Sequence, residues 1–187
     1  MKIIGIVGRS GTGKSYISAF FKEKGALVID GDKIAHALMK EGPLVNELAD
    51  AFGKDILCEN GIDRKKLGKI VFSDPTKLET LNKISHAHIC REFDRLIAES
   101  DAPFAVIDAA ALIESEYKCD ILVAVLSDDK TCAERIVNRD NISREDALSR
   151  LSAQKKDDFY TQNADFIIIN DGRDITPILK EIYEKAI

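Results

Sequence analysis

The sequence lacks an excess of basic residues, paired cysteines and long apolar runs, and each absence excludes a class of function. Its 187 residues carry 27 Lys and Arg against 32 Asp and Glu, a net charge of −5. General nucleic-acid binding needs a basic surface and is not expected. None of the four cysteines lies in a C-x-x-C pair, so neither a zinc site nor a redox dithiol is indicated.

The chain also has no apolar run approaching the roughly 18 residues that span a bilayer. It begins with a strand pattern and not with the layout of a signal peptide. Its three histidines include His86 and His88, which would lie on opposite sides of a helix and make a poor metal site. We therefore expect a cytoplasmic, reduced protein without a membrane partner, folded as a single domain of 1–187.

The segment Gly8–Ser15 carries the most specific signal, since it fits the pattern G-x-x-x-x-G-K-[ST]. An apolar run at 2–7 precedes it and an amphipathic stretch follows, which is the strand–loop–helix context of a P-loop. Backbone N–H groups of such a loop and the positive end of the following helix suit a phosphate chain. Lys14 is expected to reach the β- and γ-phosphates and Ser15 to ligate Mg²⁺. The chain is therefore predicted to bind a nucleoside triphosphate.

Short apolar runs predict five buried strands that alternate with helical patterns. They lie at 2–7, 26–29, 104–108, 121–126 and 166–169. This alternation predicts an α/β fold with a five-stranded parallel sheet and right-handed crossovers, the three-layer P-loop NTPase fold. We assign the core to 1–32 and 101–187. Residues 33–100 show helical patterns without a convincing strand and predict a helical insertion.

Ligands of a parallel α/β sheet bind beyond the carboxyl ends of its strands. That rule places Gly8, Asp30, Asp32, Asp108 and Asn170 along one edge of the sheet. A carboxylate there can accept the proton of a phosphoryl acceptor. Asp30 or Asp32 suits this role, although Asp32 could equally be the N-cap of the next helix.

Asp108 ends an apolar strand, as the acidic residue of a Walker B strand does, and could hold Mg²⁺ directly or through water. The alternative is a strand-end residue satisfied by backbone amides. Several arginines follow the fourth strand, and Arg139 lies in a presumed hinge before the capping-box pattern at 143–146. Arginines on a lid could neutralise charge in the transition state, although a solvated helix face is commoner for such a run.

Over nearly its whole length the sequence resembles the dephospho-coenzyme A kinase family, of the nucleoside-monophosphate-kinase-like P-loop class. The P-loop and Val28–Ala35, which is similar to the family's V-I-D-A-D-x-I-A, carry the resemblance first. Further stretches follow in the same order, at 52–57, 60–72, 138–145, Gln154, 164–165 and 170–172.

The resemblance implies ATP-dependent phosphorylation of the ribose 3′-hydroxyl of dephospho-CoA, the last step of coenzyme A synthesis, with Mg²⁺. By motif position, Asp32 is the base that receives the hydroxyl proton, and Lys14 and Arg139 stabilise the transferring phosphoryl group. Residues 33–100 form the acceptor-binding part and 138–157 the lid. A monomer or weak homo-oligomer is expected.

The same resemblance and the P-loop together assign residues to each ligand. The nucleotide-binding residues are Gly8, Ser10, Gly11, Thr12, Gly13, Lys14, Ser15, Tyr16, Arg139 and Asn170. The acceptor-binding residues are Asp32, Arg64, His86 and Asp108, and the metal ligands are Ser15 and Asp108.

The sequence departs from the family's pattern at several positions. Arg9 and Tyr16 replace the second glycine and the final threonine of the usual Gly-Gly-Ile-Gly-Ser-Gly-Lys-Ser-Thr. Ala87 and Ala110 replace prolines, and Cys132 replaces a glutamine. Two alternatives stay open: a related small-molecule or nucleotide kinase with another acceptor, and a nucleotide-binding regulatory protein without transfer activity.

Overall fold

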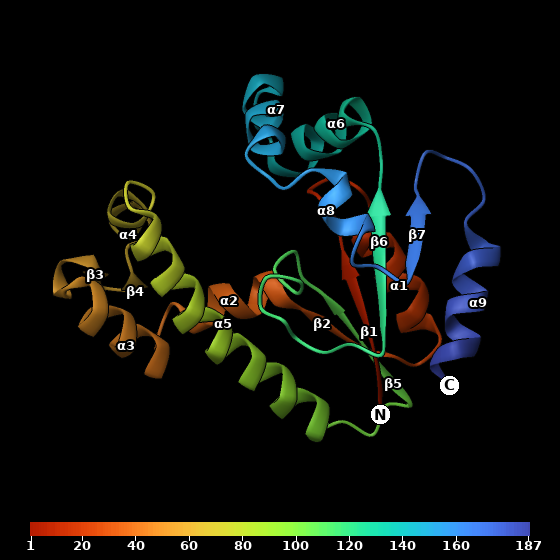
Figure 1. Cartoon of the computed structure of the whole chain (residues 1–187), viewed down its shortest axis with the longest axis horizontal. Helices are drawn as coiled ribbons and strands as arrows, with labels where there is room; N and C mark the ends of the chain where they lie inside the picture. Colours follow the sequence, from red (N-terminus) through yellow and green to blue (C-terminus); the bar gives the residue numbers. More distant parts are fainter. The chain divides into compact units, whose positions relative to one another are not determined.

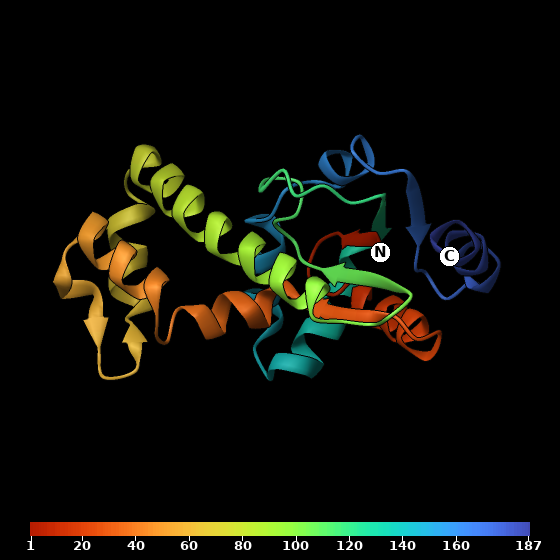
Figure 2. The ribbon, with the colours of Figure 1, turned by 90° about the horizontal axis from the view of Figure 1, so that it is seen from below.

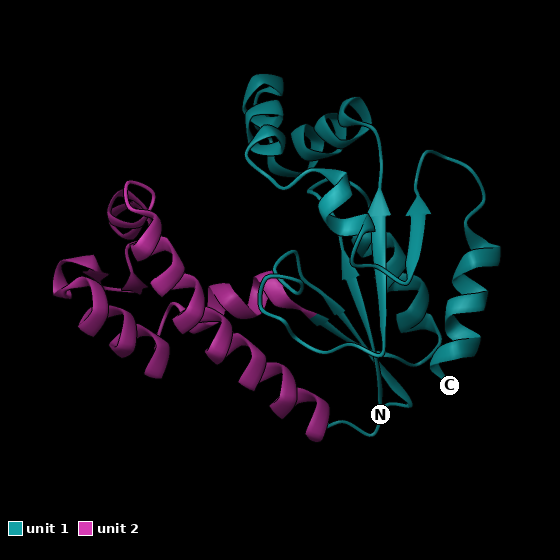
Figure 3. Ribbon diagram, in the orientation of Figure 1, with its two compact units in different colours: residues 1–29, 100–187 teal, residues 30–99 magenta.

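The computed structural model describes residues 1–187 and divides them into two compact units. Unit 1 comprises residues 1–29 and 100–187, and unit 2 comprises residues 30–99 (Figure 3). None of the helices combines the length and apolar character that a bilayer-spanning segment needs.

Unit 1 is built on a five-stranded sheet, as predicted. Its strands, in the spatial order β2-β5-β1-β6-β7, are β2 (Leu27–Asp30), β5 (Phe104–Asp108), β1 (Lys2–Val7), β6 (Ile121–Leu126) and β7 (Phe166–Ile169). The pairs β1·β5, β1·β6 and β6·β7 are all parallel. Because β1 is the central strand, the chain leaves the middle of the sheet at Gly8. The strand that ends at Asp30 is separated from β1 by β5.

Helices α1 (Lys14–Glu23) and α9 (Thr176–Ala186) cover one face of this sheet. Both views place α9 beside β7 (Figures 1 and 2). Alternate strand residues point to opposite faces, so one apolar set packs against the two helices. This core includes Ile4, Ile6, Phe21, Phe104, Val123, Val125, Ile168, Leu179 and Ile182. Gly5 faces the other way, toward Leu112 and Leu122.

Helices α6 (Asp129–Asp140) and α7 (Arg144–Ser152) follow β6 and lie at its carboxyl end (Figure 1). They pack through a small core of their own: Cys132, Ala133, Ile136, Ala147 and Leu151. The Ser143 side chain caps α7 by accepting the N–H of Asp146, as the capping-box pattern predicts. Asp128 caps α6 by accepting the N–H of Thr131, and the neighbouring Ser127 donates to the Asn170 carbonyl.

Unit 2 is mainly helical. In order it contains α2 (Gly31–Leu38), α3 (Pro43–Phe52), a 3-10 turn (Lys54–Ile56), β3 (Leu57–Cys58), β4 (Gly61–Ile62), α4 (Arg64–Val71) and α5 (Pro75–Ala98). Pro43 and Pro75 lie in the first turns of α3 and α5, and Asp63 and Asp74 are the N-caps of α4 and α5. Its core is Leu44, Leu48, Ile56, Ile62, Leu67 and Val71.

The expectation that residues 33–100 contain no strand is wrong. Strands β3 and β4 form an antiparallel hairpin in which Leu57 is opposite Ile62. Each strand has only two residues, too few to show the alternation that identifies a strand in a sequence. The N–H of Ile62 also donates to the carbonyl of Met39 at 2.9 Å, so a contact outside the hairpin holds it in place.

We expect Leu48→Ala to lower the free energy of unfolding by about 2–5 kcal/mol, the range for truncating a buried leucine. Leu48 is fully buried, whereas Leu148 on α7 is 41% exposed. The matched variant Leu148→Ala should therefore change stability by less than about 1 kcal/mol. Chemical denaturation of both variants measures this difference. Equal effects would contradict the core assignment of Leu48.

Candidate functional site

Donor side chains hold the carbonyl groups of the P-loop on one side of the loop. Arg135 on α6 donates from Nη1 to the carbonyl oxygens of Gly11, at 3.0 Å, and Thr12, at 3.1 Å. Asn170, directly after β7, donates to the same Thr12 oxygen at 2.8 Å. Across a planar peptide the C=O of one residue and the N–H of the next point in opposite directions. These bonds therefore direct the N–H groups of Thr12 and Gly13 to the opposite side, as anion binding requires.

Two glycines of the loop are required by their surroundings. A Cβ atom on Gly11 (φ +80°) would lie 2.5 Å from the Cys132 carbonyl oxygen, and one on Gly13 (φ +98°) would lie 2.1 Å from Asn170 Nδ2. Only glycine permits both the backbone conformation and this close approach. Gly13 is also the N-cap of α1, whose first N–H groups have no partner within the helix and face the end of the loop.

The side chains of Lys14 and Thr12 donate hydrogen bonds to carbonyl groups at the start of the loop. The Lys14 ammonium lies 3.0 Å from the carbonyl oxygen of Gly8 and 3.2 Å from that of Arg9. The buried Thr12 hydroxyl donates to the Arg9 carbonyl at 3.0 Å. Tyr16, also predicted to bind nucleotide, is 66% exposed on the first turn of α1.

Asp108 and Ser15 are the two residues predicted to hold Mg²⁺. Asp108 ends β5 opposite Ile6 of β1, and its carboxylate lies 3.5 Å from the Ser18 hydroxyl. Ser18 and Ser15 are three residues apart and share one side of α1. Mg²⁺ takes one or two protein oxygens together with phosphate oxygens and water, so a serine hydroxyl and an aspartate carboxylate are donors of the right kind. No cluster of three or more His, Cys, Asp or Glu side chains could hold a metal by itself.

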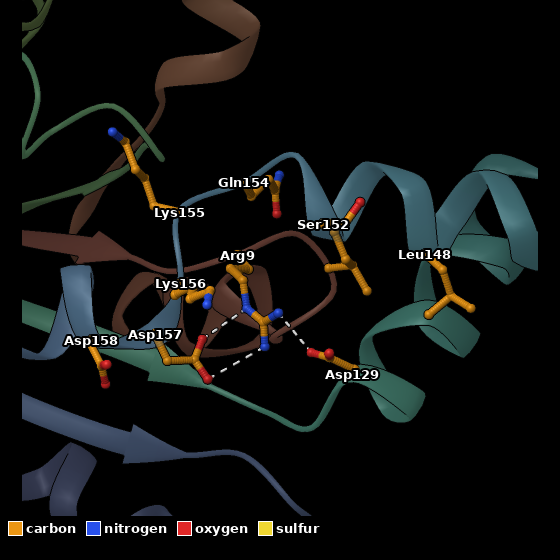
Figure 4. A pocket seen from close by; sticks show the side chains of 10 residues that line it. Arg9, Asp129, Leu148, Ser152, Gln154, Lys155, Lys156, Asp157 and Asp158 are labelled. Atoms are coloured by element: carbon orange, nitrogen blue, oxygen red, sulfur yellow. Dashed lines mark hydrogen bonds and ion pairs between the residues drawn. The ribbon is translucent and has the colours of Figure 1, made fainter.

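A cavity of about 680 Å³ lies beside the P-loop, and Arg9 is one of the residues that line it (Figure 4). Arg9 Nη1 is 2.7 Å from Asp129 at the start of α6, and Nε is 2.8 Å from Asp157 at the start of α8 (Asp157–Thr161). Burial alone would lower the pKa of the Arg9 guanidinium, but the hydrogen bond to Asp129 and the charges of both aspartates raise it. Gln154, which also lines the cavity, exchanges two 2.9 Å hydrogen bonds with Ser10.

Arg139 lies in the last turn of α6 and not in a hinge outside a helix, which corrects its predicted place. The helix continues through Asp140 because the turn to a left-handed conformation comes only at Asn141 (φ 53°). Arg139 Nε donates to Asp140 at 2.7 Å, and Arg150 of α7 donates to the same carboxylate. These bonds, that of Arg139 first, lower the pKa of Asp140 to about 2.

Asp30 and Asp32 have different environments within unit 2. Asp30 is the N-cap of α2: its carboxylate accepts the N–H of Lys33 at 3.0 Å and pairs with the Lys33 ammonium at 2.9 Å. Asp32 is exposed in the first turn of α2. The alternative that Asp32 caps this helix is therefore wrong, and its carboxylate is not committed to the cap.

The other predicted acceptor contacts, Arg64 and His86, also belong to unit 2. Arg64 is the exposed first residue of α4, and His86 is half-buried on α5. The neighbouring His88 is buried and its Nε2 lies 2.7 Å from a carboxylate oxygen of Glu47. His88 thus joins α5 to α3.

Arg135 belongs to the run of arginines predicted after the fourth strand, but the sequence did not single it out as a site residue. Arg135 lies 124 residues from Gly11 in the chain, and no local pattern links the two. A weak signal existed, because Arg135 is three residues after the buried Cys132 and so near the inner face of α6. Arg9 was noted only as a departure from a family pattern, although it joins the loop to α6 and α8.

Comparison with known proteins supplies independent findings. A family model described as dephospho-CoA kinase matches residues 2–175. The dephospho-CoA kinase of Aquifex aeolicus is 36% identical over 192 residues, which cover 99% of this chain and 97% of that protein.

Solved structures share the fold. The protein TT1252 from Thermus thermophilus aligns with a TM-score of 0.82 and 26% identity over 98% of this chain and 97% of its own. Shikimate kinase from Acinetobacter baumannii aligns with a TM-score of 0.56 and 14% identity over 99% of this chain and 92% of its own. The second likeness shows that kinases with little sequence similarity have this fold.

We expect an NMR titration to give Asp140 a carboxyl pKa of about 2. Arg139→Ala should raise this pKa toward the ordinary value of 3.8 more than Arg150→Ala does, because the Arg139 bond is the larger cause. A depressed pKa stabilises the fold above the unfolded value, so this contribution is lost only as the pH falls toward 2. Asp171, paired with Arg173, serves as the control that neither variant shifts. A pKa near 3.8 for Asp140 in the wild-type protein would contradict its pairing with Arg139 and Arg150.

Proposed function

The chain belongs to the dephospho-CoA kinase family, and we propose that it transfers the γ-phosphoryl group of ATP to the ribose 3′-hydroxyl of dephospho-CoA. The observation that carries this proposal is the family match over residues 2–175, joined to a P-loop whose carbonyl groups are held by Arg135 and Asn170. Such a loop binds a phosphate chain through its N–H groups.

The protein forms no covalent bond with the transferred phosphoryl group. Catalysis therefore depends mainly on positioning the two substrates and on stabilising the charge of the transition state. We assign binding of the β- and γ-phosphates to the N–H groups of the loop and of the first turn of α1. The Lys14 ammonium, which lies across the loop, adds a positive charge that stabilises the transferring phosphoryl group. Arg139 is assigned the same role from the 138–157 segment, the proposed lid.

When bound, Mg²⁺ would supply positive charge that neutralises the negative charge developing during phosphoryl transfer. The proposed ligands are the Ser15 hydroxyl and the Asp108 carboxylate, the latter directly or through water. The proximity of Asp108 to Ser18, one turn beyond Ser15, supports this pairing.

Asp32 is the proposed base that receives the proton of the 3′-hydroxyl. Support comes from its neighbour: Asp30 is engaged by Lys33 and the helix cap, and hydrogen bonds from Lys33 outweigh burial and lower the pKa of Asp30, which makes it a weaker base. The Asp32 carboxylate does not cap the helix in this way. Residues 33–100 are the proposed acceptor-binding part, with Arg64 and His86 as its contacts.

A coupled assay of ADP release tests the acceptor directly. With ATP and Mg²⁺, we expect turnover with dephospho-CoA and at least about 100-fold lower kcat/KM with nucleoside monophosphates, because a missing set of polar contacts reduces binding of the transition state strongly. Mass spectrometry should locate the new phosphate on the 3′-oxygen. Turnover only with a monophosphate would favour a related kinase, and ATP binding without any turnover would favour a regulatory protein.

The pair Asp32→Asn and Asp30→Asn tests the base. We expect Asp32→Asn to lower kcat by roughly 10²–10⁴ with ATP affinity unchanged, the usual contribution of a general base. Asparagine is an effective N-cap, so Asp30→Asn should keep α2 intact and lower kcat far less. Single-turnover kinetics and ATP titration measure both effects. The reverse order of the two variants would assign the base to Asp30.

A further inference from the structure

Arg9 is a feature of this chain that the proposed mechanism leaves unused. It occupies the second position of the P-loop, where the resembling family usually has glycine. Its side chain is only 12% exposed, and its guanidinium contacts two aspartates. One positive charge between two negative charges leaves no net positive charge to offer a phosphate, so Arg9 is not suited to bind nucleotide directly.

The two aspartates stand at the two ends of one segment. Asp129 begins α6, and Asp157 begins α8, just after the loop that follows α7. Nη1 reaches Asp129 at 2.7 Å, while Nε and Nη2 reach the two oxygens of Asp157 at 2.8 and 3.4 Å. The planar guanidinium can serve two carboxylates at once in a way that a lysine ammonium cannot. Arg9 therefore joins both ends of the 129–157 segment to the P-loop (Figure 4).

The two ends depend on Arg9 to different degrees. The α6 end is also held by Arg135, which bonds the loop at Gly11 and Thr12, and by the close approach of Cys132 to Gly11. The α8 end contacts the loop through Asp157 and through Gln154, which binds the N–H and hydroxyl of Ser10. Weakening the Arg9 contacts should therefore release mainly residues 154–157.

We propose that Arg9 is a positioning residue for the kinase reaction: by bridging Asp129 and Asp157 it holds Gln154 on Ser10 and keeps α7 in place beside the P-loop before nucleotide binds. This inference rests on the proposed function for its kinetic consequence. A segment that is already ordered needs less ordering when ATP binds, so ATP binds more tightly.

The kinetic signature follows from this role. Loss of the bridge removes binding energy shared by the ground state and the transition state, so KM for ATP rises while kcat stays nearly constant. KM for dephospho-CoA stays nearly constant as well, because the bridge touches only the nucleotide-binding loop. A residue that served stability alone would lower the melting temperature without this selective change.

Arg9→Lys is the first test. It keeps a positive charge between the aspartates but removes the planar guanidinium that contacts both carboxylates at once. We expect KM for ATP to rise about tenfold, with kcat and KM for dephospho-CoA within about twofold, in line with the sensitivity of catalysis to small displacements. Arg173→Lys is the matched control, because Arg173 also contacts both oxygens of a carboxylate, that of Asp171, but at an exposed site after β7. It should leave all three constants unchanged.

Asp157→Asn is the second test. It leaves Arg9 unchanged, so it can be used even if the Arg9→Lys protein does not fold. The double variant should raise KM for ATP by much less than the product of the two single effects, because both remove the same contact. Effects that multiply, or single variants within twofold of wild type, would overturn the proposal.

Hydrogen exchange gives a readout that does not need turnover. We expect the amides of residues 152–158 to exchange at least about tenfold faster in Arg9→Lys than in wild type, while amides of α6 change little. Unchanged exchange there would overturn the proposal. If the wild type fails to phosphorylate dephospho-CoA, the proposed function fails, and the dissociation constant of ATP and the exchange rates still decide the role of Arg9.

Discussion

The structure depends on one constraint, the close packing of the P-loop against the start of α6. A Cβ atom on Gly11 would come within 2.5 Å of the Cys132 carbonyl oxygen, so glycine is what lets the two backbones meet. Arg135, one turn farther along α6, then reaches the Gly11 and Thr12 carbonyls. Because the carbonyls are held, the next N–H groups point to the other side of the loop. The orientation of the phosphate-binding groups thus depends on Arg135, which lies 124 residues after Gly11 in the sequence.

The central position of β1 gives this loop its support. β1 pairs with β5 on one side and β6 on the other, so the ends of both neighbours lie next to the start of the P-loop. β5 supplies Asp108, and β6 leads into α6 with its arginines. Parallel strands bring residues far apart in sequence to one edge. The same topology explains why the site draws on so many separate segments.

In this acidic protein, arginine side chains pair with nearby aspartate side chains. Arginines pair with aspartates in two clusters, as Arg9 does with Asp129 and Asp157 and as Arg139 and Arg150 do with Asp140. Exposed pairs of this kind contribute little to stability, whereas the half-buried Arg9 contacts join separate elements. The two arrangements suit different tasks: Arg9 fixes backbone segments, and Arg139 lies at an exposed helix end.

The sequence alone determined the P-loop, the five strands and the family, because each of these depends on local patterns or on their order. It could not determine the β3–β4 hairpin, whose strands are too short for a pattern, or which aspartate caps α2. The sequence also could not predict contacts between residues far apart in the chain. The pairs are Arg135 and Gly11, Arg9 and Asp157, and Asn170 and Thr12, which are separated by 124, 148 and 158 residues. Only tertiary packing brings such partners together, because their meeting depends on every element folded between them.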